Sequence, residues 1–349
     1  MRRVTTLASA LVAGALVLTA CGGSSGGAST TPSGSTTSSP KSSLKVGMAY
    51  DIGGRGDQSF NDAAAAGLDK ATADLGITSK EAEATNGEAD SAKEERLRVL
   101  AQAGYNPVIA VGFAYSAAVA KVAKEMPDTH FAIIDDEAAV GDNITNLVFA
   151  EEQGSFLVGA AAALKTKKNS IGFIGGVDVP LIHKFEAGYE AGAKAVTPNI
   201  KIQVKYLTQP PDFSGFGDPA KGKTAAAGMY DAGADIVYAA AGGSGAGVFQ
   251  AAKAAGAKAI GVDSDQYKTA DPAVQSVILT SMLKRVDVAV YDFIKNATTG
   301  NYASGTVRYD LSKDGVGYAT SGGQVDDIAS KLDDFKQKII SGEITVPTK

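Results

Sequence analysis

The sequence lacks tryptophan altogether and has one cysteine and two histidines among its 349 residues. One thiol cannot form a disulfide within the chain, and the chain has too few cysteines and histidines for a zinc site of the usual Cys/His composition. The two histidines, His130 and His183, lie far apart in the sequence, and we expect both to be structural. We therefore expect no enzymatic activity, no metal and no cofactor.

Positive charge is also scarce, and no cluster of basic residues occurs. Lysine and arginine total 33 against 38 aspartates and glutamates, which gives a formal net charge of −5. Cleavage of a leader that carries Arg2 and Arg3 would make the chain still more acidic. Because nucleic-acid binding depends on basic patches, we expect no nucleic-acid partner.

The apolar residues 7–20 follow two arginines and end at the single cysteine, Cys21. This layout is typical of a secretory signal peptide, and the apolar stretch is shorter than the about 20 residues that span a bilayer. Residues 18–21, Leu-Thr-Ala-Cys, resemble the lipobox of bacterial lipoproteins. We predict a signal peptide over 1–20 and a lipidated Cys21, carrying palmitate-type chains, on the extracytoplasmic face of the cell membrane. The alternative is an exported protein with a chance cysteine at this position.

The segment that follows Cys21 consists almost entirely of glycine, serine, threonine, alanine and proline, with Lys41 as its one charge. Such a composition buries too little apolar surface to offset the entropy of ordering. We predict a flexible linker over residues 21–43. A diacylated cysteine supplies the two chains that stable membrane attachment needs, so the linker would tether the folded part to the membrane.

From Leu44 to Lys349 the chain is long enough for two domains. Short runs rich in β-branched residues alternate with stretches that carry apolar residues at helical spacing. This alternation predicts an α/β fold with parallel sheets covered by helices on both faces. The expected strands are 44–50, 108–111, 130–134, 144–149, 170–174, 202–206, 235–239, 259–262 and 274–280, and expected helical segments include 155–164, 187–196 and 248–255.

Ligands of such sheets bind beyond the carboxyl ends of the strands. In this chain an acid, a glycine pair or an aromatic residue follows strand after strand, which favours a binding site there. The residues in question are Tyr50–Gly54, Gly112 and Phe113, Asp135 and Asp136, Glu151 and Glu152, Gly175 and Gly176, Gly242–Gly245, and Asp263–Asp265.

The motif Tyr50-Asp-Ile-Gly-Gly54, followed by Asp57-Gln-Ser-Phe-Asn61, resembles the opening signature of the basic membrane protein (Bmp) family. The resemblance continues in the right order over nearly all of residues 44–295. It implies a substrate-binding lipoprotein of an ABC importer, in a family whose characterised members bind purine nucleosides. The other matching segments are 111–113, 131–135, 146–159, 175–180, 185–188, 218–223, 233–235, 241–243, 261–266 and 280–285.

The resemblance implies the type I periplasmic binding protein fold, in which two doubly wound parallel-sheet lobes close on a ligand by hinge motion. Lobe 1 is expected to contain residues 44–150 plus about 284–305, and lobe 2 residues 151–280 plus about 320–349. The expected partners are a purine nucleoside in the interlobe cleft, the ABC permease subunits and, through the lipid anchor, the membrane. We expect a monomer.

The family resemblance and the chemistry of a purine base together imply roles for four residues. Phe60 is expected to stack on one face of the base, and Phe185 on the opposite face. The carboxylate of Asp135 can accept N–H donors of the base edge, with its neighbour Asp136 as the alternative. Asn61 can complement a ring nitrogen or an exocyclic group, unless it caps the following helix.

The ribose offers two neighbouring hydroxyls, for which Asp263 and Lys284 are the natural pair. The aspartate accepts from the hydroxyls, while the lysine donates to them and offsets the buried negative charge. Asp51 and Gly243 are expected to complete the rim, and Asp265 remains an alternative to Asp263 as the acceptor.

One departure from the family pattern concerns the loop before residue 218. Family members commonly have a tryptophan or another bulky aromatic there, whereas this chain offers Phe213 and Phe216. The preference among guanosine, adenosine and inosine therefore stays open. Two other interpretations also remain: a binding protein for another small solute, such as a sugar or an autoinducer, and a surface lipoprotein that acts by protein contact.

Overall fold

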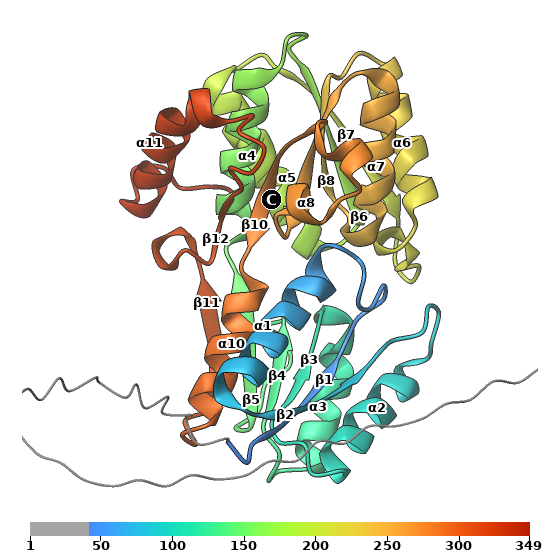
Figure 1. Ribbon diagram of the computed structural model, residues 1–349, viewed down its shortest axis with the longest axis vertical. Helices are drawn as coiled ribbons and strands as arrows, with labels where there is room; N and C mark the ends of the chain where they lie inside the picture. The colour runs from blue at the N-terminus through green and yellow to red at the C-terminus, as the bar shows by residue number, and fades with distance from the viewer. Residues whose placement is uncertain (1–41) are drawn as a thin grey trace, which may run out of the picture. The chain divides into compact units, whose positions relative to one another are not determined.

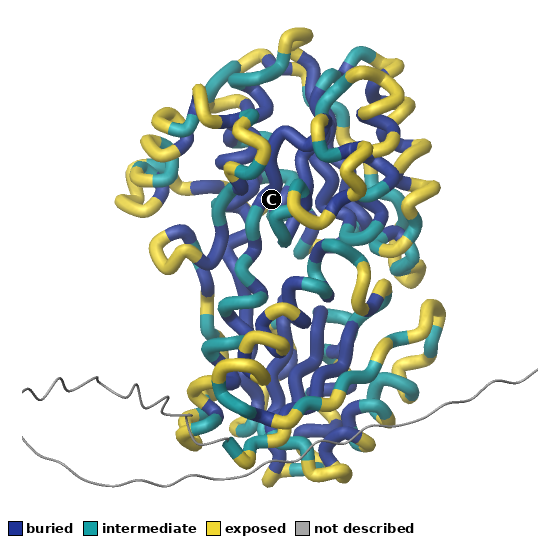
Figure 2. The backbone as a smooth tube through the Cα atoms, viewed as in Figure 1, coloured by how far each residue is buried: buried dark blue, intermediate teal, exposed yellow. Residues whose placement is uncertain are grey.

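The computed structural model describes residues 42–349 (Figures 1 and 2). The expected signal peptide, Cys21 and nearly all of the expected linker lie outside the described residues. Within the described part, no helix combines the length and the apolar character that a membrane crossing requires.

The chain forms two six-stranded sheets. The order of the first is β11-β5-β4-β3-β1-β2, with parallel neighbours throughout. The order of the second is β12-β10-β9-β8-β6-β7, where β12 runs antiparallel to β10 and the other pairs are parallel. The strands are β1 (Lys45–Ala49), β2 (Thr78–Ala82), β3 (Val108–Ala110), β4 (Phe131–Ile134), β5 (Ile144–Phe149), β6 (Ser170–Val177), β7 (Lys201–Thr208), β8 (Ile236–Ala240), β9 (Lys258–Asp263), β10 (Ile278–Lys284), β11 (Gly305–Tyr309) and β12 (Val316–Tyr318).

Helices surround both sheets, and Figure 1 shows α1, α2, α3 and α10 around the first sheet and the other helices around the second. The first sheet with its four helices is called lobe 1 below, and the rest of the folded chain lobe 2. The helices are α1 (Phe60–Leu75), α2 (Asp90–Gln102), α3 (Ser116–Glu125), α4 (Glu151–Lys165), α5 (Pro180–Val196), α6 (Pro219–Asp231), α7 (Gly245–Ala255), α8 (Gln266–Thr269), α9 (Pro272–Gln275), α10 (Val286–Ala297) and α11 (Ala329–Ile340), with short 3-10 turns η1 (Phe113–Tyr115), η2 (Ser214–Phe216), η3 (Gly242–Ser244), η4 (Leu311–Lys313) and η5 (Asp326–Ile328).

The central strands are buried because helices cover both faces of each sheet. All four residues of β4 and all eight of β6 are buried, and both strands are almost wholly apolar. The edge strands β2 and β7 carry polar residues and are partly exposed. The predicted α/β class with two doubly wound, parallel-sheet lobes is confirmed.

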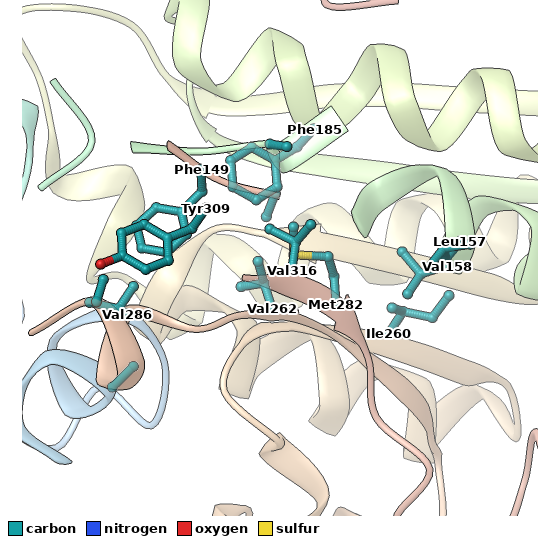
Figure 3. Close-up of a cluster of buried hydrophobic side chains, with 14 of the residues drawn as sticks. Phe149, Leu157, Val158, Phe185, Ile260, Val262, Met282, Val286, Tyr309 and Val316 are labelled. Carbon is teal, nitrogen blue, oxygen red and sulfur yellow. The ribbon is translucent and has the colours of Figure 1, made fainter. Parts of the chain in front are cut away.

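The chain passes between the lobes after β5, after β10 and between β11 and β12. The amide of Ala150 donates to the carbonyl of Tyr309, and the amide of Arg285 donates to the carbonyl of Gly315, both at 2.9 Å. Hydrogen bonds thus join the crossing segments to one another. Apolar side chains from both lobes also meet beside them, namely Phe149, Tyr309, Phe185, Met282 and Val316 (Figure 3).

Two expectations about strands differ from the structure. The strand expected over 274–280 begins only at Ile278, because Pro272 starts the short helix α9 before it. Strands β2, β11 and β12 were not expected, since they are short or polar and all three lie at sheet edges. The first sheet includes β11, which begins at Gly305, where the range expected for lobe 1 ends.

Candidate functional site

The carboxyl ends of strands from both sheets surround one cavity between the lobes. Lobe 1 contributes the loop after β1, the start of α1 and the residues that follow β3 and β4. Lobe 2 contributes the first turns of α5, the loop before α6 and the ends of β8, β9 and β10. The lining residues are Asp51, Ile52, Asp57, Phe60, Asn61, Gly112, Phe113, Asp135, Leu181, Ile182, Phe185, Phe216, Ala240, Gly242, Val262, Asp263 and Lys284.

Lys284, at the end of β10, is the charged centre of the cavity. Its side chain is 3% exposed, and its Nζ atom donates to Oδ2 of Asp135 at 2.5 Å and lies 3.5 Å from Oδ1 of Asp263. Burial alone would lower the pKa of Lys284, but the carboxylates of Asp135 and Asp263 outweigh it and raise that pKa. The lysine therefore stays charged and bridges an acid from each lobe.

The two aspartates beside Lys284 each keep one oxygen free of hydrogen bonds. Oδ1 of Asp135 and Oδ1 of Asp263 are both buried without a hydrogen-bond partner within the described protein. Burial raises the pKa of Asp135, and the nearby ammonium of Lys284 opposes that shift. Buried polar atoms are normally paired, so these two oxygens are the acceptors that a bound molecule could satisfy.

Aromatic rings surround the same ammonium group. Nζ of Lys284 lies 4.5 Å from the ring centroid of Phe60, in lobe 1, and 5.5 Å from that of Phe185, in lobe 2. A second aromatic contact joins the lobes where Phe113 meets Phe213 edge to face, with ring centroids 5.9 Å apart. The cavity thus combines apolar ring surfaces with buried charge, which suits a flat ligand with polar edges.

The start of α1 orders the polar side of the cavity. Asp57 accepts from the backbone amides of Ser59, Asn61 and Asp62 and from the side chain of Asn61. The side-chain oxygen of Asn61 accepts from the amide of Asp51, and its amide nitrogen also donates to a backbone carbonyl. The side chain of Asn61 therefore holds the loop after β1 in place through hydrogen bonds, although Asn61 also borders the cavity.

Asp51 and Asp57 are partly buried acids whose pKa values are raised. Burial raises the pKa of Asp51 to about 6, against the lowering effect of the amide of Ile52. Burial also raises the pKa of Asp57 to about 6, against three backbone amides that lower it. Both carboxyl groups are therefore ionised at neutral pH and become neutral in mildly acidic solution.

The structure brings seven of the eight expected ligand-binding residues to this cavity, as the lining given above shows. The eighth, Gly243, is not part of the lining, because its neighbour Gly242 borders the cavity and Gly243 lies against Phe216 and Asp57. Lys284 was expected to pair with Asp263, but its shorter contact is with Asp135.

Both alternative aspartates are engaged elsewhere. Asp136 accepts from the hydroxyl of Ser116 and from the amides of Ala138 and Ala139, so it caps its own loop. Asp265 accepts from the hydroxyl of Ser321 and pairs with a lysine on α8. Neither residue borders the cavity. Asp135 and Asp263 are the members of each pair that do.

Other lining residues were not among those expected. Phe216 and Phe113 were noticed in the sequence only as loop aromatics, and Leu181 and Ile182 on α5 gave no signal beyond helical apolar spacing. Their positions depend on how the two lobes meet, which strand and helix patterns do not specify. Two signals were available in the sequence: an aromatic residue after a strand for Phe113, and the loop before residue 218, in which family members carry a bulky aromatic residue, for Phe216.

Residues 217–224 read Gly-Asp-Pro-Ala-Lys-Gly-Lys-Thr, which has the letter pattern of a phosphate-binding loop. In the structure, α6 already begins at Pro219, and Asp218 caps it by accepting from the amide of Lys221 at 2.9 Å. Gly222 therefore lies inside the helix, where a Cβ atom would come within 2.2 Å of the carbonyl oxygen of Ser244. The glycine permits close packing, and this segment forms no cradle for a phosphate.

The two lobes, their three connections and the cavity between strand ends define the type I periplasmic binding protein fold, which solute-binding proteins of ABC transporters share. A crystal structure of such a protein from Aeropyrum pernix K1 aligns with a TM-score of 0.76 and 29% identity, over 88% of this chain and 94% of that one. The family described as "ABC transporter substrate-binding protein PnrA-like" matches residues 44–349. The chain belongs to this family, Bmp.

Similar proteins come from several organisms. The "CD4+ T-cell-stimulating antigen" of Listeria monocytogenes is 37% identical over 98% of this chain and 97% of its own length. The "ABC transporter nucleoside-binding protein BmpA" of Lactococcus lactis is 36% identical over 88% of this chain and 90% of its own. An "Uncharacterized lipoprotein" of Pyrococcus abyssi is 35% identical over 79% of this chain and 69% of its own length.

Proposed function

We propose that this protein captures purine nucleosides, such as guanosine, adenosine or inosine, in the interlobe cavity and delivers them to an ABC permease. The observation that carries the proposal is the arrangement of Phe60 and Phe185 with the buried acids Asp135 and Asp263 around Lys284. Aromatic rings suit a flat base, and carboxylate oxygens suit N–H and O–H donors. The name of the Lactococcus lactis relative supports the same ligand class.

The base is proposed to bind on the side of Phe60. Stacking on an aromatic ring contributes about 1–3 kcal/mol per base, and Phe60 is half-buried at the cavity wall. The free Oδ1 atom of Asp135 is an acceptor for N–H groups on the base edge. Asp51 can accept a further N–H group, because only one of its oxygens accepts a backbone amide.

The ribose is proposed to bind between Asp263 and Lys284. Oδ1 of Asp263 lacks a hydrogen-bond partner, so it can accept from a ribose hydroxyl. The ammonium of Lys284 has three donors, and Asp135 takes one of them at hydrogen-bond distance. A ribose diol beside these two groups can donate to Oδ1 of Asp263 and accept from the ammonium of Lys284.

The same proposal places the protein on the extracytoplasmic face of a membrane, tethered through lipidated Cys21 and acting as a monomer without enzymatic activity. The family consists of substrate-binding proteins of ABC transporters, and the Pyrococcus abyssi relative is named a lipoprotein. A tether of this kind would keep the loaded protein near its permease. Replacement of Cys21 by alanine should release the protein from membranes without loss of ligand binding.

Titration calorimetry of the purified protein tests the ligand class. The protein is unfolded and refolded first, to remove any ligand that copurifies, and is then titrated with guanosine, adenosine, inosine, uridine and ribose. We expect binding of at least one purine nucleoside at micromolar concentration or below, with weaker binding of uridine and of ribose. A refolded protein that binds no purine nucleoside, or that prefers ribose, would contradict the proposal, and mass spectrometry of the copurifying ligand would then identify the solute.

A further inference from the structure

Two loops from opposite lobes form hydrogen bonds directly beside the cavity. Ser59 is fully buried, and its hydroxyl donates to Oδ2 of Asp263 at 2.7 Å and lies 3.2 Å from the carbonyl oxygen of Val262. The hydroxyl of Ser264 donates to the carbonyl of Ser59 at 2.9 Å. These bonds join the start of α1 in lobe 1 to the end of β9 in lobe 2.

Gln266 adds a further bond between the same loops, and lobe 2 holds its side chain in place for it. Its Oε1 atom accepts from the amide of Val262 at 2.9 Å, and its backbone amide donates to the hydroxyl of Ser281 at 3.2 Å. A Cβ atom on Gly261 would come within 2.4 Å of Oε1, so only glycine leaves room there. The remaining donor, Nε2, reaches across to the carbonyl of Gln58 at 2.9 Å.

The backbone on both sides of this contact adopts a conformation that other residues than glycine rarely take. Gln58 has φ of 55° and Asp263 has φ of 65°. Left-handed backbone at such residues costs free energy and persists only where surrounding contacts favour it. The interlobe hydrogen bonds to the Gln58 carbonyl and to the Asp263 carboxylate are contacts of this kind.

We propose that residues 58–59 and 262–266, here called the clasp, couple closure of the lobes to the orientation of Asp263, with Ser59 and Gln266 as positioning residues. The inference rests on the proposed function, because it assigns Asp263 to the bound ligand. With Oδ2 held by Ser59, the other oxygen, Oδ1, keeps one direction beside Lys284. When the lobes separate, Ser59 withdraws and the carboxylate of Asp263 loses that constraint.

A prediction for binding rates follows from this geometry. Ligand enters while the lobes are apart, when the clasp is not formed, so the clasp has little influence on association. Ligand leaves only after the clasp opens, so each of its hydrogen bonds slows dissociation. If the clasp acts as proposed, its loss changes the dissociation rate constant of the ligand and leaves the association rate constant nearly unchanged. A residue that only stabilises the fold would instead change the unfolding of the protein.

Two substitutions remove the interlobe bonds of Ser59 and of Gln266 and leave the bond from Ser264 to the Ser59 carbonyl in place, and each has a control. Ser59→Ala removes the donor to Asp263, and its control is Ser116→Ala, which removes a serine donor to Asp136 within lobe 1. Gln266→Glu keeps the acceptor for the amide of Val262 but replaces the donor to the carbonyl of Gln58. Its control is Gln275→Glu, whose donor serves the carbonyl of Ala270 within lobe 2.

Stopped-flow measurements with guanosine as the probe should show the rate effect. We expect Ser59→Ala and Gln266→Glu to raise the dissociation rate constant roughly tenfold or more, since a hydrogen bond to a charged or buried acceptor is lost. The association rate constant should change by less than about threefold. Thermal unfolding of Ser59→Ala without ligand should be unchanged within the scatter of the two controls. Gln266→Glu should unfold at a lower temperature than its control, because Gln266 is 2% exposed and burial of a carboxyl group is unfavourable. Equal dissociation rates in the variants and in their controls would overturn the clasp.

A second measurement does not depend on the identity of the ligand. Spin labels on cysteines introduced at the exposed positions Asp128 in lobe 1 and Asp231 in lobe 2, in a Cys21→Ser background, report the interlobe distance. We expect Ser59→Ala and Gln266→Glu to increase the fraction of open protein. If wild-type protein binds no nucleoside while this shift occurs, the proposed function is wrong and the clasp stands. If guanosine binds while distances and dissociation rates stay unchanged, the clasp is wrong and the function stands.

Discussion

The two lobes have the same sheet plan but present different chemistry to the cavity. Lobe 1 supplies four of the six polar side chains that line the cavity, whereas lobe 2 supplies six of the nine apolar ones. Each lobe contributes one strand-end aspartate, Asp135 and Asp263, with φ of 64° and 65°. The polar lining of lobe 1 is Asp51, Asp57, Asn61 and Asp135, and the apolar lining of lobe 2 is Leu181, Ile182, Phe185, Phe216, Ala240 and Val262.

The two aspartates also occupy matching places in their sheets. Asp135 follows β4 and Asp263 ends β9, and each of these strands is third in the order of its sheet. The difference lies in the partner of Oδ2, which is the ammonium of Lys284 for Asp135 and the hydroxyl of Ser59 for Asp263. The same strand position in the two sheets thus determines where each carboxylate lies. The side chain that faces the carboxylate determines whether its partner is charged or neutral.

The largest effect is expected where the charge pair between Asp135 of lobe 1 and Lys284 of lobe 2 is broken. Asp135→Asn preserves shape but leaves Lys284 with only the more distant Asp263 at 3.5 Å. Loss of one partner of a buried pair should lower the free energy of unfolding by on the order of 2–3 kcal/mol. Guanosine should bind roughly a hundredfold more weakly, since a charged acceptor for the base is also lost. Chemical denaturation and calorimetry measure the two effects.

The neighbouring residue supplies the control for Asp135. Asp136→Asn alters a carboxylate that caps its own loop and does not line the cavity. It should change guanosine affinity by less than about threefold, because capping contacts contribute about 1 kcal/mol to stability rather than to binding. If both substitutions weaken guanosine equally, Asp135 does not contact the ligand.

A smaller effect is expected from the aromatic rings, and it should differ between the lobes. Phe60 is half-buried, whereas Phe185 is 2% exposed and belongs to the core. Phe60→Leu should weaken guanosine binding roughly tenfold, because stacking is worth about 1–3 kcal/mol per base, with little change in stability. Phe185→Leu should also lower the free energy of unfolding, by about 1–2 kcal/mol.

Calorimetry with guanosine and urea titration of the same samples separate these contributions. An affinity of Phe60→Leu equal to that of the unchanged protein would remove Phe60 from the base-binding surface. An unchanged free energy of unfolding for Phe185→Leu would show that the Phe185 ring contributes to ligand binding and not to stability. Phe60 and Phe185 would then have the same role in the two lobes.

Much of the cavity lining could be predicted from the sequence, because the ends of the strands can be recognised from the residue pattern. Asp135 and Asp263 could be predicted since each follows a buried β-branched run, and parallel strands bring such ends together. Phe60 and Asn61 were predicted from a motif. The motif alone did not show that the side-chain amide of Asn61 forms hydrogen bonds with the backbone of the loop around Asp51.

Other features could not be predicted, because they depend on how the lobes meet. Ser59 lay inside the motif, yet its partner Asp263 is 204 residues further along the chain and lies in the other lobe. Gly243 was chosen from a glycine-rich loop, in which a one-residue difference decides which glycine borders the cavity. The strand expected over 274–280 overlapped a helical turn, because the apolar spacing of so short a segment fits both structures.

A predicted effect on the pH dependence of stability, rather than on ligand binding, concerns the connections between the lobes, where the lobes differ in charge. After β5 the chain continues into the buried acid Glu151, whereas β10 ends in the buried Lys284. Burial and the nearby charge of Asp135 raise the pKa of Glu151 to about 8, although Lys284 and Lys184 act in the opposite direction. Glu151 therefore carries a proton at neutral pH in the folded protein.

Glu151→Gln should make stability less dependent on pH. The raised pKa means that the folded state binds a proton that the unfolded state has released, over the range from about pH 4.5 to about 8. Stability from this group is therefore present at low pH and is lost as pH rises towards 8, at up to about 1.4 kcal/mol per pH unit. Glutamine stays neutral and removes that slope, so the variant should gain stability relative to wild type between pH 6 and pH 8.

Urea titrations at several pH values measure this gain, with the exposed Glu137→Gln as the control. Parallel pH profiles for wild type and Glu151→Gln would mean that Glu151 is ionised in the folded protein, with Lys184 and Lys284 compensating its burial.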